Sequence, residues 1–292
     1  MINFRLLLKG LAMGSADVIP GVSGGTIAII TGIYEELINS IKSVDNTALR
    51  YVLRGQFKDF WSHINGAFLV SVFSGVLISI FTLAKAISYL LENQPIILWS
   101  FFFGLILAST FFVFPKVINW KTCLFGVLGA GIAYLITSLS PTSSPDHLWF
   151  VFIAGAIAIC AMILPGISGS FILILLAKYE YVLEAVKSFN LVVIVVFGLG
   201  CVVGLLSFSK FIHWLLQKYK DITMAALAGF MLGSLNKIWP WKEVAGESFK
   251  NLLPADYANL SGQPSQFVLA ILFCVAGSII VVMLERFGKS KE

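Results

Sequence analysis

The sequence has little charge. Only 12% of its residues are Asp, Glu, Lys or Arg, against roughly 25% in an ordinary globular domain, whereas 58% are hydrophobic. A soluble core could not absorb that much apolar surface, because the outer face of a soluble domain must meet water. The composition therefore excludes a chain of soluble domains and predicts a protein whose solvent is lipid.

Cysteine and histidine are scarce as well. The four cysteines lie inside apolar runs without CxxC spacing, and the three histidines are scattered, so no disulfide, metal site or cofactor is predicted. There is no Walker loop, HExxH, GxGxxG or Ser-His-Asp set. The formal charge of +5 comes from basic residues that lie between apolar segments, so it indicates membrane orientation and no nucleic-acid partner.

Long apolar segments are what the sequence does contain. A spanning helix needs about 20 apolar residues. Six segments are predicted to span: Ile64–Leu91, Ile96–Phe114, Thr122–Leu139, Leu191–Leu216, Ile222–Trp239 and Phe267–Leu284. Leu11–Ile41 and Leu148–Val186 are too long for one crossing and are interrupted by Pro and Gly. Each is predicted to be a re-entrant helical hairpin that enters and leaves on one side of the membrane.

The two interrupted stretches are related to each other. Aligning Pro20 with Pro165 also pairs Gly21 with Gly166, Ser23 with Ser168, Gly24 with Gly169, Tyr34 with Tyr179 and Glu35 with Glu180. A second match follows in the same order, around Lys85 and Lys210. Two ordered matches indicate an internal duplication, with one repeat in residues 1–147 and the other in residues 148–292.

The distribution of basic residues predicts the topology. A hairpin plus three full crossings per half inverts the second half, giving an all-α inverted-repeat transporter. Lys and Arg then gather in the inside loops, while the outside loops hold only Lys187, Lys242 and Lys250. If the first broken segment crossed once, Lys42, Arg50, Arg54 and Lys58 would move outside and weaken this bias. Both termini are therefore predicted to be cytoplasmic.

The hairpin loops are the predicted substrate site. Proline breaks the helix, glycine allows close approach of a ligand, and a restarting helix points free N–H groups at the loop, a combination that suits an anion near the membrane midplane. The candidate residues are Pro20, Gly21, Ser23, Gly24, Gly25, Thr26, Pro165, Gly166, Ser168, Gly169 and Ser170. The alternative is that these glycines only let helices pack closely.

Three carboxylates and two lysines complete the set of candidates. Asp17, Glu35 and Glu180 are candidates for coupling to a proton or a sodium ion. Asp17 has a structural alternative, which is to bond the broken backbone, and the two glutamates have one as interfacial anchors. Lys85 and Lys210 either attract a lipid phosphate, one from each side, or extend to the headgroup layer.

At MGSADVIPGVSGGTIAIITGIYEELI the sequence resembles a bacterial and archaeal membrane family associated with polyprenyl-phosphate transport, the PopT type. The resemblance covers nearly the whole chain. It implies a plasma-membrane flippase that returns undecaprenyl phosphate, the cell-wall lipid carrier, to the inner leaflet. The family motif falls on Asp17, Pro20, Gly21, Ser23, Gly24, Gly25 and Thr26. The second hairpin departs from it, because Ala161 or Met162 stands where Asp17 would pair and Ser170 replaces Gly25.

Two other functions stay open at this stage. One is an undecaprenyl-pyrophosphate phosphatase with similar hairpins. The resemblance to such enzymes implies an arginine beside the motif serine, but Gly24 and Gly169 stand at that position here. Phosphoryl transfer depends on that kind of cationic stabilisation. The other is an ion-coupled transporter of a small anion. A wide cleft open to lipid would favour the polyprenyl substrate, and a narrow closed pocket would favour the small anion.

Overall fold

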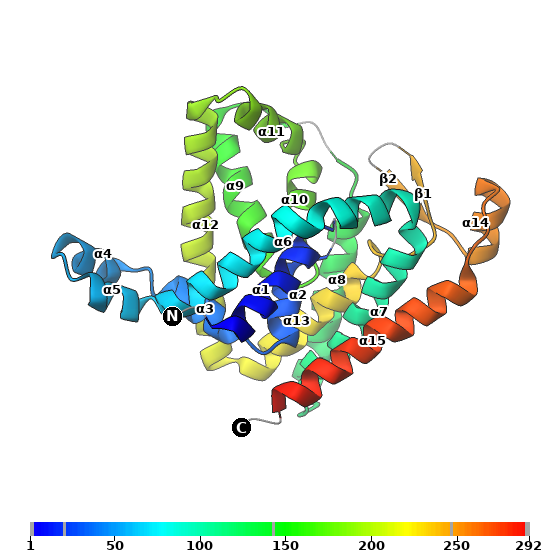
Figure 1. The fold of residues 1–292 in the computed structure, drawn as a ribbon, viewed down its shortest axis with the longest axis horizontal. Helices are drawn as coiled ribbons and strands as arrows, with labels where there is room; N and C mark the ends of the chain where they lie inside the picture. Colours follow the sequence, from blue (N-terminus) through cyan, green and yellow to red (C-terminus); the bar gives the residue numbers. More distant parts are fainter. Residues whose placement is uncertain (1–2, 20–21, 142–143, 246–247, 290–292) are drawn as a thin grey trace.

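The computed structural model describes residues 3–19, 22–141, 144–245 and 248–289 (Figure 1). This part of the chain forms fifteen helices and one two-stranded antiparallel sheet, which confirms the all-α prediction apart from that small sheet. Pro20 and Gly21, both predicted to contact the substrate, lie outside the described residues.

Among the described residues, five helices are long and apolar enough to cross a membrane. They are α6 (Gly66–Asn93), α7 (Pro95–Val113), α8 (Trp120–Ser138), α12 (Leu191–Lys218) and α15 (Phe267–Lys289), and each lies within a few residues of a predicted span. The sixth predicted span is shorter than expected, because α13 (Lys220–Ser234) has 15 residues, or about 22 Å of helix, against a hydrocarbon core of about 30 Å. It ends in tighter turns, in which the amides of Leu235 and Lys237 donate to carbonyls three residues back.

Each interrupted stretch consists of three helices. The first contains α1 (Phe4–Asp17), α2 (Gly24–Ile30) and α3 (Tyr34–Lys42). The second contains α9 (Leu148–Ile163), α10 (Gly169–Leu175) and α11 (Tyr179–Lys187). The chain breaks a second time after α2 and after α10, where Gly32 (φ 73°) and Ala177 (φ 49°) adopt left-handed backbone conformations. Each returning arm is therefore a short helix followed by a separate one.

The main helix pairs fall into two kinds, two pairs within one half of the chain each and two pairs between the halves. Helix α1 packs along α6, and α9 packs along α12, while α7 packs along α15 and α8 along α13. Glycine permits the close approach, since a Cβ on Gly10 would overlap the Val72 carbonyl and one on Gly200 would overlap the Phe152 carbonyl. The helix lengths also correspond, because α6 and α12 each have 28 residues and α2 and α10 each have 7.

The remaining elements lie at the periphery. Helices α4 (Asn46–Leu53) and α5 (Phe57–His63) project at one side, and α14 (Pro254–Ser261) lies at the other (Figure 1). Strands β1 (Lys242–Ala245) and β2 (Ser248–Asn251) form the hairpin that precedes α14. The largest apolar core includes residues of the first broken segment and reaches α7, α13 and α15, so Ile19 and Val22, on either side of the break, are buried in it.

Candidate functional site

The loops of the two broken segments meet inside the protein. The Ser23 hydroxyl donates to the carbonyl oxygens of Met162 and Leu164, both at 3.2 Å. In the other direction, the Gly166 amide donates to Thr26 Oγ1 at 3.0 Å. Ser23 and Thr26 are fully buried, so these bonds satisfy polar groups that water does not reach. Residues more than 130 positions apart are thereby held together.

Each loop also starts its own helix. Ser23 Oγ accepts from the Gly25 amide at 3.1 Å, and Ser168 Oγ accepts from the Phe171 amide at 3.3 Å, so both serines act as N-caps. The Ser168 and Ser170 hydroxyls are 2.7 Å apart and bonded to each other. Gly25 has no room for a side chain, because a Cβ there would lie 2.7 Å from the Ile163 carbonyl oxygen. Close packing, the structural alternative, therefore explains part of the glycine pattern.

Asp17 is the last residue of α1, and its carboxylate reaches the first residue of α2. Its Oδ1 accepts a hydrogen bond from the Gly24 amide at 2.6 Å. The carboxylate therefore binds an amide that the sequence analysis expects to donate to a phosphate. A Cβ on Gly24 would lie 2.5 Å from Asp17 Oδ2, which explains glycine at that position. The structure thus shows Asp17 bonding the broken backbone. The coupling role stays a prediction.

A cavity of about 160 Å³ adjoins this carboxylate. Its walls are mostly apolar side chains of α3, α6, α9 and α12, with Asp17 and Tyr34 as polar members. Tyr34 is only 4% exposed, and its hydroxyl has no hydrogen-bond partner among the described residues. Phe73 and Met162, on the same wall, are 48% and 39% exposed, so the cavity borders the surface that would face lipid.

A second cavity, of about 480 Å³, lies on the other side of the same contact. It is lined by apolar residues of α8, α12 and α13, including Phe208, Phe230 and Leu164. Ile163 lines the first cavity and Leu164 the second, so the segment that accepts the Ser23 hydrogen bonds separates the two.

The other predicted residues are not brought to the loops. Glu35 forms an ion pair with Lys220 at 2.6 Å on the partly exposed side of α3. Glu180, Lys85 and Lys210 are exposed, and none of these residues lines either cavity. Their roles in coupling or phosphate attraction stay predictions. In the described ranges there is also no group of three His, Cys, Asp or Glu side chains placed to hold a metal ion.

Two lysines that no motif marks are placed near the second hairpin. Lys178 is 1% exposed, and its Nζ lies 2.5 Å from Asp146 Oδ1 and 3.2 Å from the Ser144 carbonyl oxygen. It ties the start of α11 to the connection between α8 and α9. Lys237 lies against Phe171 in α10, with Nζ 4.4 Å from the ring centroid. For Lys178, the sequence signal was a lysine in an apolar stretch whose aligned position in the first hairpin, Ile33, is not basic.

Comparison with known proteins gives a consistent result. The family model described as "VCA0040-like: Undecaprenyl phosphate translocase-like" matches residues 13–252. A protein of Vibrio cholerae serotype O1 named polyprenyl-phosphate transporter is 48% identical over 295 residues, covering 97% of this chain and 96% of the relative. A Staphylococcus aureus protein with the same name is 33% identical over 255 residues, covering 80% of this chain and 85% of the relative. No solved structure matches.

Proposed function

Because the chain belongs to the VCA0040-like, undecaprenyl phosphate translocase-like family, we propose that it carries undecaprenyl phosphate across a bacterial plasma membrane. The family is one of transporters, as the motif predicts, and the chain is a multi-pass membrane protein. The phosphatase alternative is set aside on the same finding. It also lacks chemical support, because Gly24 and Gly169 place no cation beside the motif serines.

Two inverted repeats, residues 1–147 and 148–292, would build this transporter. The matching helix lengths support the repeat, as does the pairing of α1 with α6 and of α9 with α12. In such a protein the substrate site lies between the repeats, near the membrane midplane. The hydrogen bonds of Ser23 and Thr26, which join one broken segment to the other, support a site at that interface.

The proposed orientation has both termini in the cytoplasm. Residues assigned to the inside contact one another, since Glu35 pairs with Lys220 and Lys42 Nζ lies 3.1 Å from His213 Nε2. On the side proposed to be outside, Lys178 lies just before α11, the helix that ends at Lys187, and pairs with Asp146 in the connection between α8 and α9. This grouping agrees with the excess of basic residues on the inside.

The hydrogen bonds between the hairpins carry the proposed mechanism. When the loops separate, the Ser23 hydroxyl, the Thr26 hydroxyl and the Gly166 amide each lose a partner. A buried donor without a partner costs about 1–3 kcal/mol, so separation is favoured when phosphate oxygens supply new acceptors. The substrate headgroup would thus replace contacts between the halves, which couples binding to their movement. Ser168 and Ser170, bonded only to their own loop, would complete the donor set.

Asp17 is the carboxylate best placed to couple an ion to this exchange. Its negative charge holds the Gly24 amide and would repel a phosphate at the same position. A proton or a sodium ion on Asp17 would weaken both effects and release the amide to the substrate. Glu35 and Glu180 stay predictions for coupling, since they lie away from the loops.

The apolar cavities favour a lipid over a small anion. Both have almost entirely apolar walls, which suit a prenyl chain and offer little to a free anion. The larger cavity begins at Leu164, next to the proposed phosphate site, and continues along α12 to Tyr219. The prenyl chain would leave the headgroup site along this groove and remain in contact with lipid.

Headgroup translocation in proteoliposomes tests the proposal. The wild-type protein should move undecaprenyl phosphate between leaflets, and the double variant Ser23→Ala with Gly24→Leu should lose at least about tenfold in rate at equal reconstitution. Gly198→Leu is a matched control, because that glycine has open space around it. Equal rates for the two variants would overturn the hairpin site, and a wild-type protein without translocation would overturn the transport function.

A further inference from the structure

A polar pocket of about 310 Å³ lies apart from the hairpin loops, at the end of the molecule that carries β1 and β2. Three segments form it: the end of α8 and the residues that follow, the turn after α13, and strand β2. Its polar and aromatic members are Tyr134, Ser138, Ser140, Asn236, Phe249 and Asn251. The apolar cavities described above share none of these residues.

Side-chain hydrogen bonds hold the three segments in fixed positions. Asn251 Nδ2 donates to Asn236 Oδ1 at 2.8 Å and to the Asn236 carbonyl oxygen at 2.9 Å. Asn236 Nδ2 in turn lies 3.3 Å from Thr137 Oγ1 and 3.2 Å from Ser138 Oγ. A pocket whose polar groups already bond one another loses little conformational entropy when a ligand binds.

Two partly buried ammonium groups lie beside this pocket. Lys237 Nζ lies 4.1 Å from the centroid of Phe249, a pocket residue, and 4.4 Å from that of Phe171. Lys242 Nζ donates to the Lys237 carbonyl oxygen at 2.6 Å and lies 3.9 Å from the centroid of Trp99. Within the described ranges neither lysine forms an ion pair. Aromatic faces and a carbonyl attract a cation but do not neutralise it.

The titration of Lys242 agrees with an uncompensated charge. Burial, together with the nearby Lys237, lowers the pKa of Lys242 to about 7. A carboxylate partner would act in the opposite direction. The site therefore gains electrostatic stabilisation when an anion enters it.

Lys237 connects the pocket to the second hairpin. Phe249 lines the pocket, and Phe171 is the third residue of α10, directly after Ser170. The Lys237 ammonium therefore contacts both a residue of the polar pocket and the first turn of α10. Lys242 belongs to a loop predicted to lie outside the cell.

We propose that Lys237, Lys242 and this pocket form an outer capture site for the phosphate monoester of the substrate. The inference rests on the proposed transport function and adds a first binding step on the outer face. A phosphate held there by two ammonium groups would exchange them for the donors of the hairpin loops. Free inorganic phosphate has the same chemistry, so the test must separate the two sources.

The test compares Lys237→Met, Lys237→Arg and Lys250→Met in nanodiscs and in proteoliposomes. Lys250 is a matched control, since it follows Phe249 on the same strand and its side chain is exposed. Loss of one charge-assisted contact should weaken binding of undecaprenyl phosphate about tenfold in Lys237→Met. KM for transport should rise similarly, with a maximal rate close to that of the wild type. Lys237→Arg and Lys250→Met should stay within about threefold of wild type.

Each outcome decides one point. Binding by Lys237→Met equal to that by Lys250→Met overturns the capture site, even if wild-type transport is intact. A loss shared by Lys237→Met and Lys237→Arg, with a lowered melting temperature, also overturns it, because the residue would then be structural. Inorganic phosphate that binds more tightly than the lipid, with the same dependence on Lys237, overturns the lipid as the ligand. Failure of wild-type transport counts against the proposed function, while the binding comparison still decides the capture site.

Discussion

Ser23 concentrates several interactions in one hydroxyl group. Its oxygen caps α2 through the Gly25 amide, and its proton is shared by two carbonyl oxygens of the other half. Ser168, with which Ser23 aligns in the sequence, caps α10, and its hydrogen bonds to described residues stay within its own loop. The serines are therefore equivalent as helix caps and unequal as links between the halves. This difference adds to the one made by Asp17, which has no counterpart in the second hairpin.

Replacement of Ser23 by alanine should lower the free energy of unfolding by about 1–3 kcal/mol, because buried carbonyl oxygens and an amide lose their partner. Thermal or denaturant unfolding in detergent measures the change. Ser188→Ala is the control, since the Ser188 side chain is exposed and bonds only within its own turn. Equal stability of the two variants would show that the link between the hairpins contributes nothing to the ground state.

Lys242 predicts a pH dependence of stability. Its pKa is about 7 in the folded protein and about 10.5 in an unfolded chain, so the unfolded state binds more protons between these values. Stability should therefore rise as pH increases from about 7 toward 10.5 and stay level below 7. Burial also lowers the pKa of Lys237 to about 8, so Lys242→Met should reduce that rise and leave the part above pH 8. Lys250→Met should keep the full rise when melting temperature is followed against pH. A wild-type curve that falls over this range would contradict the buried, uncompensated ammonium.

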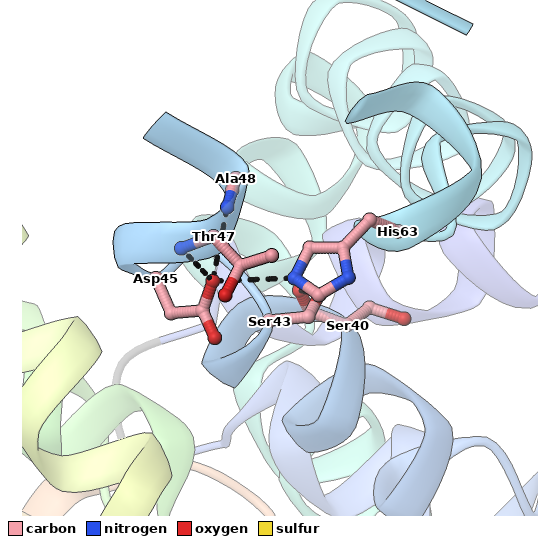
Figure 2. Close-up of polar contacts among 6 residues, drawn as sticks. All are labelled: Ser40, Ser43, Asp45, Thr47, Ala48 and His63. Carbon is pink, nitrogen blue, oxygen red and sulfur yellow. Dashed lines mark hydrogen bonds and ion pairs between the residues drawn. The ribbon is translucent and has the colours of Figure 1, made fainter. Parts of the chain in front are cut away.

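At the scale of single elements, Asp45 organises the peripheral helices. Figure 2 shows its carboxylate between the start of α4 and His63, the last residue of α5. Asp45 Oδ1 accepts from the amides of Thr47 and Ala48 at 2.8 and 3.0 Å and lies 3.2 Å from His63 Nε2. The Ala48 amide and the His63 contact hold the pKa of Asp45 below its usual value, so the cap persists until pH falls through that lowered pKa.

Loss of this cap should destabilise α4 locally. Asp45→Ala should cost about 1 kcal/mol, whereas Asp45→Asn should retain most of the cap. One kilocalorie per mole corresponds to about a fivefold increase in local opening, which limited trypsin cleavage after Arg50 reports. Asp59→Ala, a change of an exposed carboxylate in α5, serves as the control. Cleavage that is unchanged in Asp45→Ala would show that tertiary contacts hold α4 without its cap.

Elements were predictable where hydrophobic length alone defines them. The span predicted at Leu191–Leu216 is observed as α12, Leu191–Lys218. Prediction was less accurate where single backbone contacts decide, as at the end of α13, at the second breaks around Gly32 and Ala177, and in the β1–β2 hairpin. A run of apolar residues indicates that a segment lies in lipid or in the protein interior. It does not describe the turn that ends the segment.

The candidate site was predictable in part for the same reason. The motif identified Ser23 and Thr26 through local chemistry, since such residues start helices and donate to anions. Their bonds to Met162 and Gly166 depend on which loop faces which, and no local pattern carries that information. Lys237 was missed because its importance comes from two aromatic rings, in α10 and β2, that the fold places beside it.

At the scale of the whole molecule, residues 1–147 and 148–292 pack together mainly through α8 with α13 and α7 with α15, and the interrupted segments add hydrogen bonds between them. Between α9 and α10, the Leu164 carbonyl and the Gly166 amide are free of helical hydrogen bonds. They bond instead to the side chains of Ser23 and Thr26 in the first broken segment. The apolar cavities lie on either side of this contact, and the polar pocket lies beyond the second hairpin. One movement of the segment around Leu164 would therefore change the phosphate site and the lipid groove together.

The proposed inverted arrangement makes a prediction about sidedness. If both broken segments are re-entrant, Arg50 and Lys218 lie in the cytoplasm, and Lys187 and Lys250 lie outside. In a variant without native cysteines, a membrane-impermeant maleimide applied to intact cells should label Lys187→Cys and Lys250→Cys. Arg50→Cys and Lys218→Cys should react only after permeabilisation. Arg50 is the decisive position, because a first segment that crossed the membrane once would place it outside. Labelling of Arg50→Cys in intact cells would make the two halves parallel and remove the basis for a site shared between inverted hairpins.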